Sequence, residues 1–200
     1  MSLGFLSPSP GAPARSPMER QALAAGARLE ERDGWNVAVG FDGEEARLAS
    51  VGFADLSHLG KVELHGSHDL ELGTARWAEG LWWCPFTAQR VLVVGEREDL
   101  PDRADAVDVT TSFAALAILG PLARELFARF TALDLRDART PVNAFRPGSV
   151  ARTPGAILRQ GEERWLMLFG AALGQYMWTV VADAAESLGG GPVGVDALDA

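Results

Sequence analysis

Three histidines lie close together in the first half of the chain, a pattern that raises the question of a metal site. They are His58, His65 and His68, with Glu63 and Asp69 nearby. A bound metal needs ligands that converge from one face, often with two histidines at helical spacing. This segment alternates like a β-strand, in which His58 and His65 have opposite parity and point to opposite faces. We therefore predict no metal site here.

Two other segments contain residue types found in catalytic or phosphate-binding sites, but they lack the neighbouring residues that such sites need. Cys84 is the sole cysteine, and no neighbouring base or positive charge would activate it, so we interpret it as a structural residue. The glycines at 189–191 follow a helical pattern and lack the Lys and Ser/Thr of a phosphate-binding loop. We predict no catalytic residue in either segment.

An aromatic cluster is the most unusual local feature of the sequence. It comprises Trp77, Trp82, Trp83 and Phe86. Adjacent tryptophans in a strand point to opposite faces, so both are buried only in a covered sheet or an interface. Core packing and a partner-binding surface both remain open, and we take the cluster as the candidate interface.

Composition excludes several classes of function. The chain has 27 Asp and Glu against 18 Lys and Arg, a formal charge of −9, which argues against nucleic acid and anionic membranes as partners. No apolar run is long enough to span a membrane, and the N-terminus lacks the pattern of a secretory signal. A single cysteine allows no internal disulfide. These features predict a cytoplasmic protein.

Hydrophobic periodicity predicts strands and helices without strict alternation, which favours the α+β class. A capping box of Ser16, Pro17 and Glu19 predicts a helix whose Leu23 and Ala27 face the core. Further helices are expected within 42–50, 121–130 and 173–184, strands at 35–39, 54–64 with a break at Gly60, 90–94, 113–119, 156–158 and 165–169, and a loop at 141–154.

The proline-rich residues 1–15 are expected to form a flexible tail. Residues 16–200 are expected to form one domain, either undivided or with subdomains at 16–108 and 109–200.

Three segments, in the right order, resemble the folate-binding fold of the glycine cleavage T-protein (aminomethyltransferase) and the sarcosine oxidase family. Residues 16–35 look like the T-protein start, where a short helix precedes a Gly-Trp strand. Residues 54–66 are similar to its D-[VL]-S-H-[ML]-G-K-x-x-x-x-G segment, and residues 116–126 resemble its L-x-x-x-G-P-x-A-R-E junction. The resemblance covers about residues 15–200 and implies a folate-binding-domain-like α+β fold of mixed or antiparallel sheets with packed helices.

The sequence departs from the catalytic T-proteins at their chemical positions. Nothing between residues 66 and 91 matches the family's Gly-Gly-x-x-Asp-Asp turn, whose Asp handles the amine; residues 73–77 take its place. The R-T-G-Y-T-G-E hairpin is reduced to residues 159–163, without the Tyr. We also expect the family's C-terminal domain to be absent after residue 198, and the folate cradle therefore to be incomplete.

This shortened form looks most like the gamma subunit of heterotetrameric sarcosine oxidase. Residues 133–135 and 145–153 echo that subunit's P-L-D-L … F-x-P-G-x-x-x-R-T stretch. The resemblance implies a non-catalytic packing subunit in a hetero-oligomer, without a cofactor of its own. FAD, FMN and NAD would then lie on larger oxidase subunits, which this chain would contact through the aromatic cluster.

An enzymatic alternative remains open. In a minimal tetrahydrofolate-dependent aminomethyltransferase, or a folate-binding protein, the resemblance implies that Leu59 lines the pterin pocket and Glu163 stands in for the hairpin Glu. A folate sensor or iron–sulfur assembly chaperone fits less well, because the reactive-Cys segment Lys-Gly-Cys-Tyr-x-Gly-Gln-Glu is absent.

Overall fold

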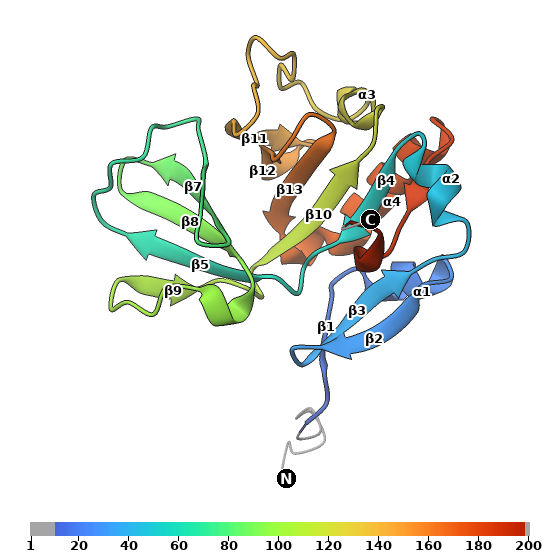
Figure 1. Ribbon diagram of the computed structural model, residues 1–200, viewed down its shortest axis with the longest axis horizontal. Coiled ribbons are helices and arrows are strands. Elements are labelled where there is room, and N and C mark those ends of the chain that lie inside the picture. Colours follow the sequence, from blue (N-terminus) through green and yellow to red (C-terminus); the bar gives the residue numbers. More distant parts are fainter. Residues whose placement is uncertain (1–10, 199–200) are drawn as a thin grey trace.

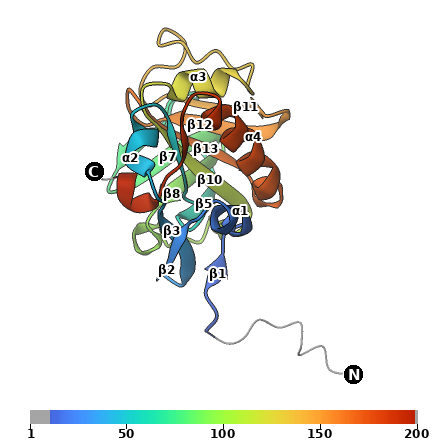
Figure 2. The ribbon, with the colours of Figure 1, turned by 90° about the vertical axis from the view of Figure 1, so that its right-hand side faces the viewer.

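The computed structural model describes residues 11–198, which form three β-sheets with four α-helices around them. The helices are α1 (Glu19–Ala24), α2 (Glu44–Leu48), α3 (Ala123–Ala128) and α4 (Gly174–Glu186). Figures 1 and 2 show α3 and α4 on the side of the molecule away from the sheet that contains β7 and β8. The architecture is α+β, as the periodicity predicts.

A six-stranded sheet forms the centre of the fold. Its order is β11 (Phe145–Val150), β12 (Thr153–Arg159), β13 (Arg164–Gly170), β10 (Phe113–Leu119), β4 (Gly52–Asp55) and β14 (Gly191–Pro192). All neighbouring pairs are antiparallel except β4 and β14. Both faces are buried, which explains the continuous apolar runs of β10 and β13.

The two faces of this sheet pack on different layers. Phe53, Ile118 and Trp165 belong to a core shared with α1, α3 and α4. On the opposite face, Ala117 and Leu166 belong to a core shared with the second sheet. Successive residues therefore alternate between two cores, as the period of a strand requires.

The second sheet has five strands, in the order β6 (Arg76–Ala78), β7 (Leu81–Thr87), β8 (Arg90–Gly95), β5 (Gly60–His65) and β9 (Ala106–Asp108). A third sheet consists of β1 (Ala14–Arg15), β3 (Trp35–Gly40) and β2 (Arg28–Arg32). Cys84, Leu92 and Val94 of the second sheet and Val37 of the third pack on the central sheet. The aromatic segment 77–86 thus lies on β6 and β7.

Several expected elements are confirmed and others need correction. The strands near 35–39, 90–94, 113–119, 156–158 and 165–169 are present, as are the three later helices. The expected loop at 141–154 is wrong, because β11 occupies 145–150. Pro147 lies on β11, which is the edge strand of its sheet, where a residue without an N–H can be accommodated.

The start of the first helix also differs from the prediction. The helix begins at Glu19, and the Ser16 hydroxyl donates to the carboxylate of Asp55 while accepting the N–H of Met18. Ser16 therefore ties the helix to β4 instead of capping it. Leu23 is 51% exposed, so its predicted core position is wrong, whereas Ala27 packs against the core.

Two expectations concern the ends of elements. The break expected at Gly60 lies at residues 56–59, and Gly60 begins β5. Residues 1–10 of the predicted flexible tail lie outside the described residues, whereas Ala14–Arg15 pair with β3.

The division into subdomains at residue 108 stays a prediction. Between residues 11 and 198 no helix is long and apolar enough to cross a membrane.

Candidate functional site

The site begins with the crossover at residues 56–59, which carries the chain from the central sheet to the second sheet. Lys61 is fully buried, and its Nζ donates to the carbonyl oxygens of Ser57 at 3.0 Å and Leu59 at 2.7 Å. Asp55 Oδ1 accepts the N–H of Ser57 at 2.9 Å. These bonds fix the path of the crossover and the position of Leu59.

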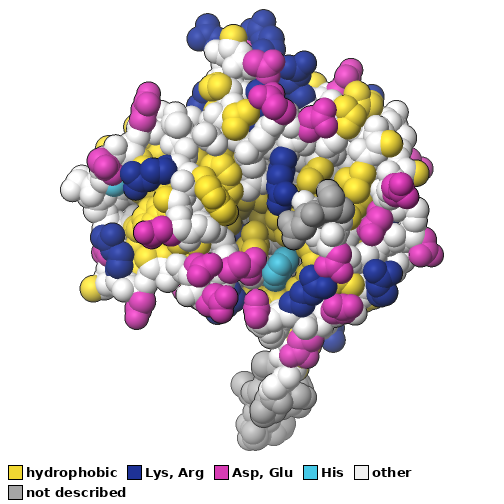
Figure 3. All heavy atoms as spheres, in the orientation of Figure 1, with side chains coloured by type: hydrophobic (Ala, Val, Ile, Leu, Met, Phe, Trp, Pro, Cys, Tyr) yellow, Lys and Arg dark blue, Asp and Glu magenta, His cyan; other side chains and the backbone are white. Residues whose placement is uncertain are grey.

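A pocket of about 610 Å³ opens where the crossover meets both sheets. Its walls are mainly apolar, and in Figure 3 apolar side chains are visible in the middle of the face shown. The lining residues come from the crossover, the β6–β7 hairpin, the end of β8, the loop before β11 and the β12–β13 hairpin: Leu56, Leu59, Trp77, Gly80, Trp82, Val94, Gly95, Glu96, Asn143, Gln160, Arg164 and Leu166. This size is within the usual range for a small-molecule site.

Two tryptophans form the wall on the second sheet. Trp77 and Trp82 are cross-strand partners on β6 and β7, and their ring centroids lie 5.0 Å apart. Trp77 is 55% exposed, whereas Trp82 is half-buried. The pair therefore presents an aromatic surface to the pocket and to solvent.

Three polar side chains of the pocket, those of Asn143, Gln160 and Arg164, come from the side opposite the second sheet. Gln160 has a buried Oε1 with no hydrogen-bond partner among the described residues. An unpaired buried acceptor is costly, so this oxygen could accept a hydrogen bond from a ligand after a small movement of its surroundings. Arg164 donates to the carbonyl oxygen of Leu198 at 2.9 Å, and Asn143 has a left-handed φ of 69°.

The pocket has few groups for acid–base chemistry. Among the described residues that line it, Glu96 is the one carboxylate, and neither aspartate nor histidine is present. General acid–base catalysis needs a positioned donor and acceptor of protons. The lining residues favour binding over proton transfer.

His58 lies in a smaller pocket beside the first. This cavity of about 240 Å³ shares Leu56, Leu59, Glu96 and Arg164 with the larger one. Burial, with a smaller effect of the nearby Lys61 ammonium, lowers the pKa of His58 to about 4. His58 is therefore neutral at pH 7.

The structure separates the residues that the sequence singled out. Leu59 lines the main pocket, whereas Glu163 is exposed and is not among the lining residues. Trp83 points to the other face of the second sheet from Trp82, and Phe86 contacts Phe145 at a ring distance of 5.1 Å. Trp77 and Trp82 therefore lie at the pocket, and Trp83 lies away from it.

The histidines and the cysteine occupy different environments. His65 Nε2 lies 2.7 Å from Glu63, and His68 Nε2 lies 2.7 Å from the carbonyl oxygen of Thr87. Within residues 11–198, no three His, Cys, Asp or Glu side chains converge as metal ligands would. Cys84 is fully buried, and burial raises the pKa of its thiol.

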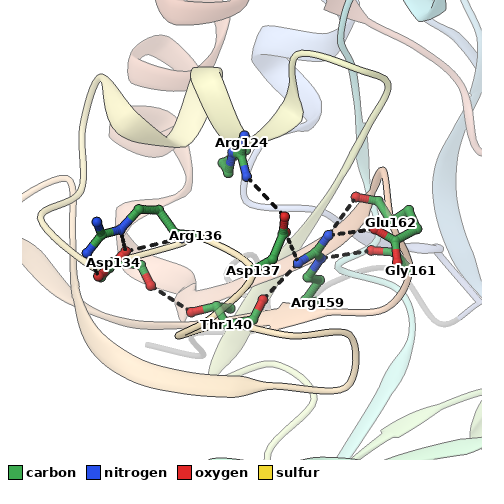
Figure 4. A network of polar contacts seen from close by, with 8 residues as sticks. All are labelled: Arg124, Asp134, Arg136, Asp137, Thr140, Arg159, Gly161 and Glu162. Atoms are coloured by element: carbon green, nitrogen blue, oxygen red, sulfur yellow. Dashed lines mark hydrogen bonds and ion pairs between the residues drawn. The ribbon is translucent and has the colours of Figure 1, made fainter.

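The β12–β13 hairpin is held in place by a buried arginine (Figure 4). The Arg159 guanidinium donates to Asp137 at 2.6 Å, to the Thr140 carbonyl at 2.9 Å and to Glu162 at 2.9 Å. It also lies 5.0 Å from the ring centre of Trp165. This network fixes the backbone from which Gln160 enters the pocket.

Sequence reasoning missed Glu96, Asn143, Gln160 and Arg164 as pocket residues. Gln160 lies within the shortened hairpin segment 159–163 and Arg164 directly follows it, so the departure from the T-protein motif was the available signal. Asn143 and Glu96 follow no motif, and their convergence depends on tertiary packing.

Comparison with known proteins gives the family. Residues 74–200 match the GCVT N-terminal domain family, so the chain belongs to that family. It is 23% identical to an aminomethyltransferase of Desulfitobacterium hafniense and 22% identical to one of Phocaeicola vulgatus. Each alignment covers 92% of this chain and 62% of the relative, so the chain spans less than two thirds of the length of these curated relatives.

Two solved structures share the fold. One chain of the heterotetrameric sarcosine oxidase from Corynebacterium sp. U-96, in complex with pyrrole 2-carboxylate, matches with a TM-score of 0.68 and 16% identity. That match covers 88% of this chain and 96% of the other. Aminomethyltransferase T of the glycine cleavage system from Bartonella henselae matches with a TM-score of 0.73 and 15% identity, covering 92% and 60%. The fold is that of the T-protein and sarcosine oxidase group.

Proposed function

We propose that this chain is a non-catalytic, gamma-type subunit of a sarcosine oxidase-like amine-oxidising complex. Trp77 and Trp82 at the mouth of the pocket carry the proposal. Trp77 ends the segment 73–77, which takes the place of the aspartate-bearing turn that the resemblance to T-proteins implies, and Trp82 is its cross-strand partner. An exposed tryptophan favours contact with a partner, and the aspartate needed for amine chemistry is not among the lining residues.

The coverage of the structural matches supports this proposal. The sarcosine oxidase chain is matched over 96% of its length, whereas the aminomethyltransferase is matched over 60%. In the proposed complex, larger subunits carry the flavin and this chain contacts them through Trp77 and its surroundings.

The test is isolation of the tagged chain from its own host under native conditions, followed by mass analysis and a visible absorption spectrum. Co-elution of larger subunits with a flavin band is the expected result. Trp77→Ala should weaken co-elution, and Leu23→Ala is the matched control because Leu23 is similarly exposed on α1. Oxidation of a methylamine by the isolated chain would contradict the proposal.

Binding of tetrahydrofolate is the second candidate, favoured by the unpaired Gln160 oxygen and the aromatic wall. The residues fit a planar heterocycle: Trp82 and Leu59 would contact its faces, and Gln160 would accept one of its N–H groups. Bound tetrahydrofolate would supply a carrier for a one-carbon unit. This chain's contribution would be to bind and orient it.

Titration of the isolated chain with tetrahydrofolate separates the two candidates. Micromolar binding that Gln160→Ala weakens and Gln89→Ala preserves would support a folate site, because Gln89 is exposed on the β7–β8 turn. Absence of binding would leave the subunit proposal alone.

A further inference from the structure

Positive charge is unevenly distributed in this acidic protein. Residues 124–159 contain seven of its 18 basic residues and three of its 27 acidic residues. That segment therefore carries a net charge of +4 within a chain of −9. It comprises α3, the loop to β11 and the β11–β12 hairpin, and Figure 3 shows several dark blue side chains on the lobe projecting at the top.

Four of these seven arginines are already engaged within the fold. Arg124 and Arg159 pair with Asp137, Arg136 pairs with Asp134, and Arg146 donates to backbone carbonyl oxygens. The side chains of the remaining three are exposed and form no hydrogen bond or ion pair with any residue in the described part of the chain. They are Arg129, Arg139 and Arg152.

Arg152 is presented by a strained turn. Ala151 and Arg152, the two residues between β11 and β12, have φ values of 47° and 61°. A two-residue hairpin of this kind needs left-handed backbone at both positions, for which Asn-Gly is the favoured sequence. Side chains with a Cβ are disfavoured there, so the fold maintains an unfavourable conformation with an arginine at its tip.

Three contacts hold this turn. The Ala151 N–H donates to the Phe130 carbonyl oxygen at 2.9 Å, and Tyr176 Oη donates to the Ala151 carbonyl oxygen at 3.0 Å. Thr153 Oγ1 donates to the Val150 carbonyl oxygen at 2.9 Å. The first of these hydrogen bonds joins Ala151 to Phe130. Arg152 follows Ala151 in the sequence and Arg129 precedes Phe130, so the two arginines lie next to the two residues that this bond joins.

From this arrangement we infer that Arg129 and Arg152 form a docking surface for a protein partner with a carboxylate-rich surface. Guanidinium groups pair well with carboxylates, and a turn fixed in advance reduces the entropy lost on binding. A nucleic acid is disfavoured as the occupant, because the rest of the chain is strongly acidic and would repel phosphates. The inference rests on the proposed function, with the larger oxidase subunits as the partner.

Association with the larger subunits is measured at low and high salt for Arg129→Glu, Arg152→Glu and Arg20→Glu. Arg20 is the matched control, since it is exposed on α1 and unpaired within the described residues. We expect each docking-surface variant to associate about tenfold more slowly at low salt, with the difference reduced at high salt. Equal rates for all three variants would overturn the inference.

A second measurement tests the docking surface independently of the proposed function. If the chain isolates without flavin-carrying subunits, the subunit proposal fails, and binding of poly-L-glutamate to the isolated chain then decides the inference. Weaker binding by Arg129→Glu and Arg152→Glu than by Arg20→Glu supports a carboxylate-binding surface. Unchanged binding, preferential binding of a DNA duplex at this surface, or self-association through it contradicts the inference.

Discussion

Lys61 Nζ lies 2.7 Å from the carbonyl oxygen of Leu59, so the sole lysine of the chain holds one of the residues that line the pocket. The ammonium is fully buried and has a second bond to the Ser57 carbonyl oxygen. Burial lowers the pKa of Lys61 to about 8, and the Asp55 and Asp108 carboxylates oppose that shift. Lys61 therefore connects the stability of the crossover to the shape of the pocket.

Lys61→Met should lower the free energy of unfolding by about 2 kcal/mol, because two buried carbonyl oxygens lose their donor. Urea denaturation measures the change, and Arg20→Met, at an exposed and unpaired position, is the control. If both variants lose the same stability, the buried bonds have no special role.

His58 should make the protein less stable in acid. Its pKa is about 4 in the folded protein against an ordinary 6.5, so between these values the unfolded chain binds more protons. Stability therefore falls as the pH falls from 6.5 to 4, by up to about 3 kcal/mol for this group. Burial raises the pKa of Asp55 above its ordinary value of 3.8. Above that pH the folded protein binds this proton better than the unfolded chain does, so Asp55 increases stability as the pH falls and opposes the effect of His58.

Comparison of the protein with His58→Gln isolates that effect. The difference between their unfolding free energies should change between pH 6.5 and 4 and stay constant above pH 7. Parallel curves over the whole range would show that His58 is not buried as a neutral group.

The elements that the sequence predicts well are those whose pattern is local. β13 is a continuous apolar run next to a short turn, and α3 follows Gly120-Pro121 with Leu126 and Phe127 on one face; both form as expected. Gly120 has a φ of 110°, and a Cβ there would lie 2.6 Å from the Ser50 carbonyl oxygen, so the junction requires glycine.

The failures depend on tertiary contacts. Leu23 fits a helical pattern, but α1 has six residues and buries Ala22 instead. β11 is interrupted by Pro147, yet its edge position tolerates a residue without an N–H. The pocket residues Asn143 and Gln160 converge only after the sheets have packed, so no spacing in the sequence predicts them.

Arg159 should be important for stability even though its charged partners are not. Asp137 and Glu162 have side chains that are 69% and 84% exposed, so their ion pairs are weakened by solvent. Arg159→Met removes the donor to the Thr140 carbonyl oxygen and the contact with Trp165, and should cost about 2 kcal/mol. Glu162→Gln should change stability by less than about 0.5 kcal/mol. Urea denaturation measures both changes. If Arg159→Met and Glu162→Gln lower the free energy of unfolding equally, the ion pair with Glu162 is the source of the stability instead.

Cys84 should resist thiol reagents in the folded protein. Its side chain is fully buried, and burial raises the pKa of the thiol, so both access and thiolate are reduced. Ellman's reagent should react with it only at the rate of unfolding, and promptly in guanidinium chloride. Rapid reaction of the native protein would contradict this burial.

Arg152→Gly should separate stability from association. Glycine adopts the φ of 61° without steric cost, so the substitution should raise the melting temperature by up to about 2–4 °C, although the greater freedom of the unfolded chain reduces the gain. The same change removes a guanidinium from the docking surface and should slow association with the larger subunits. Thr153→Ala, which removes the bond to the Val150 carbonyl oxygen, should instead lower the melting temperature. If Arg152→Gly melts at a higher temperature but associates with the larger subunits at the same rate, Arg152 has no part in docking. If it melts at a lower temperature, the turn is not strained in the way its φ values indicate.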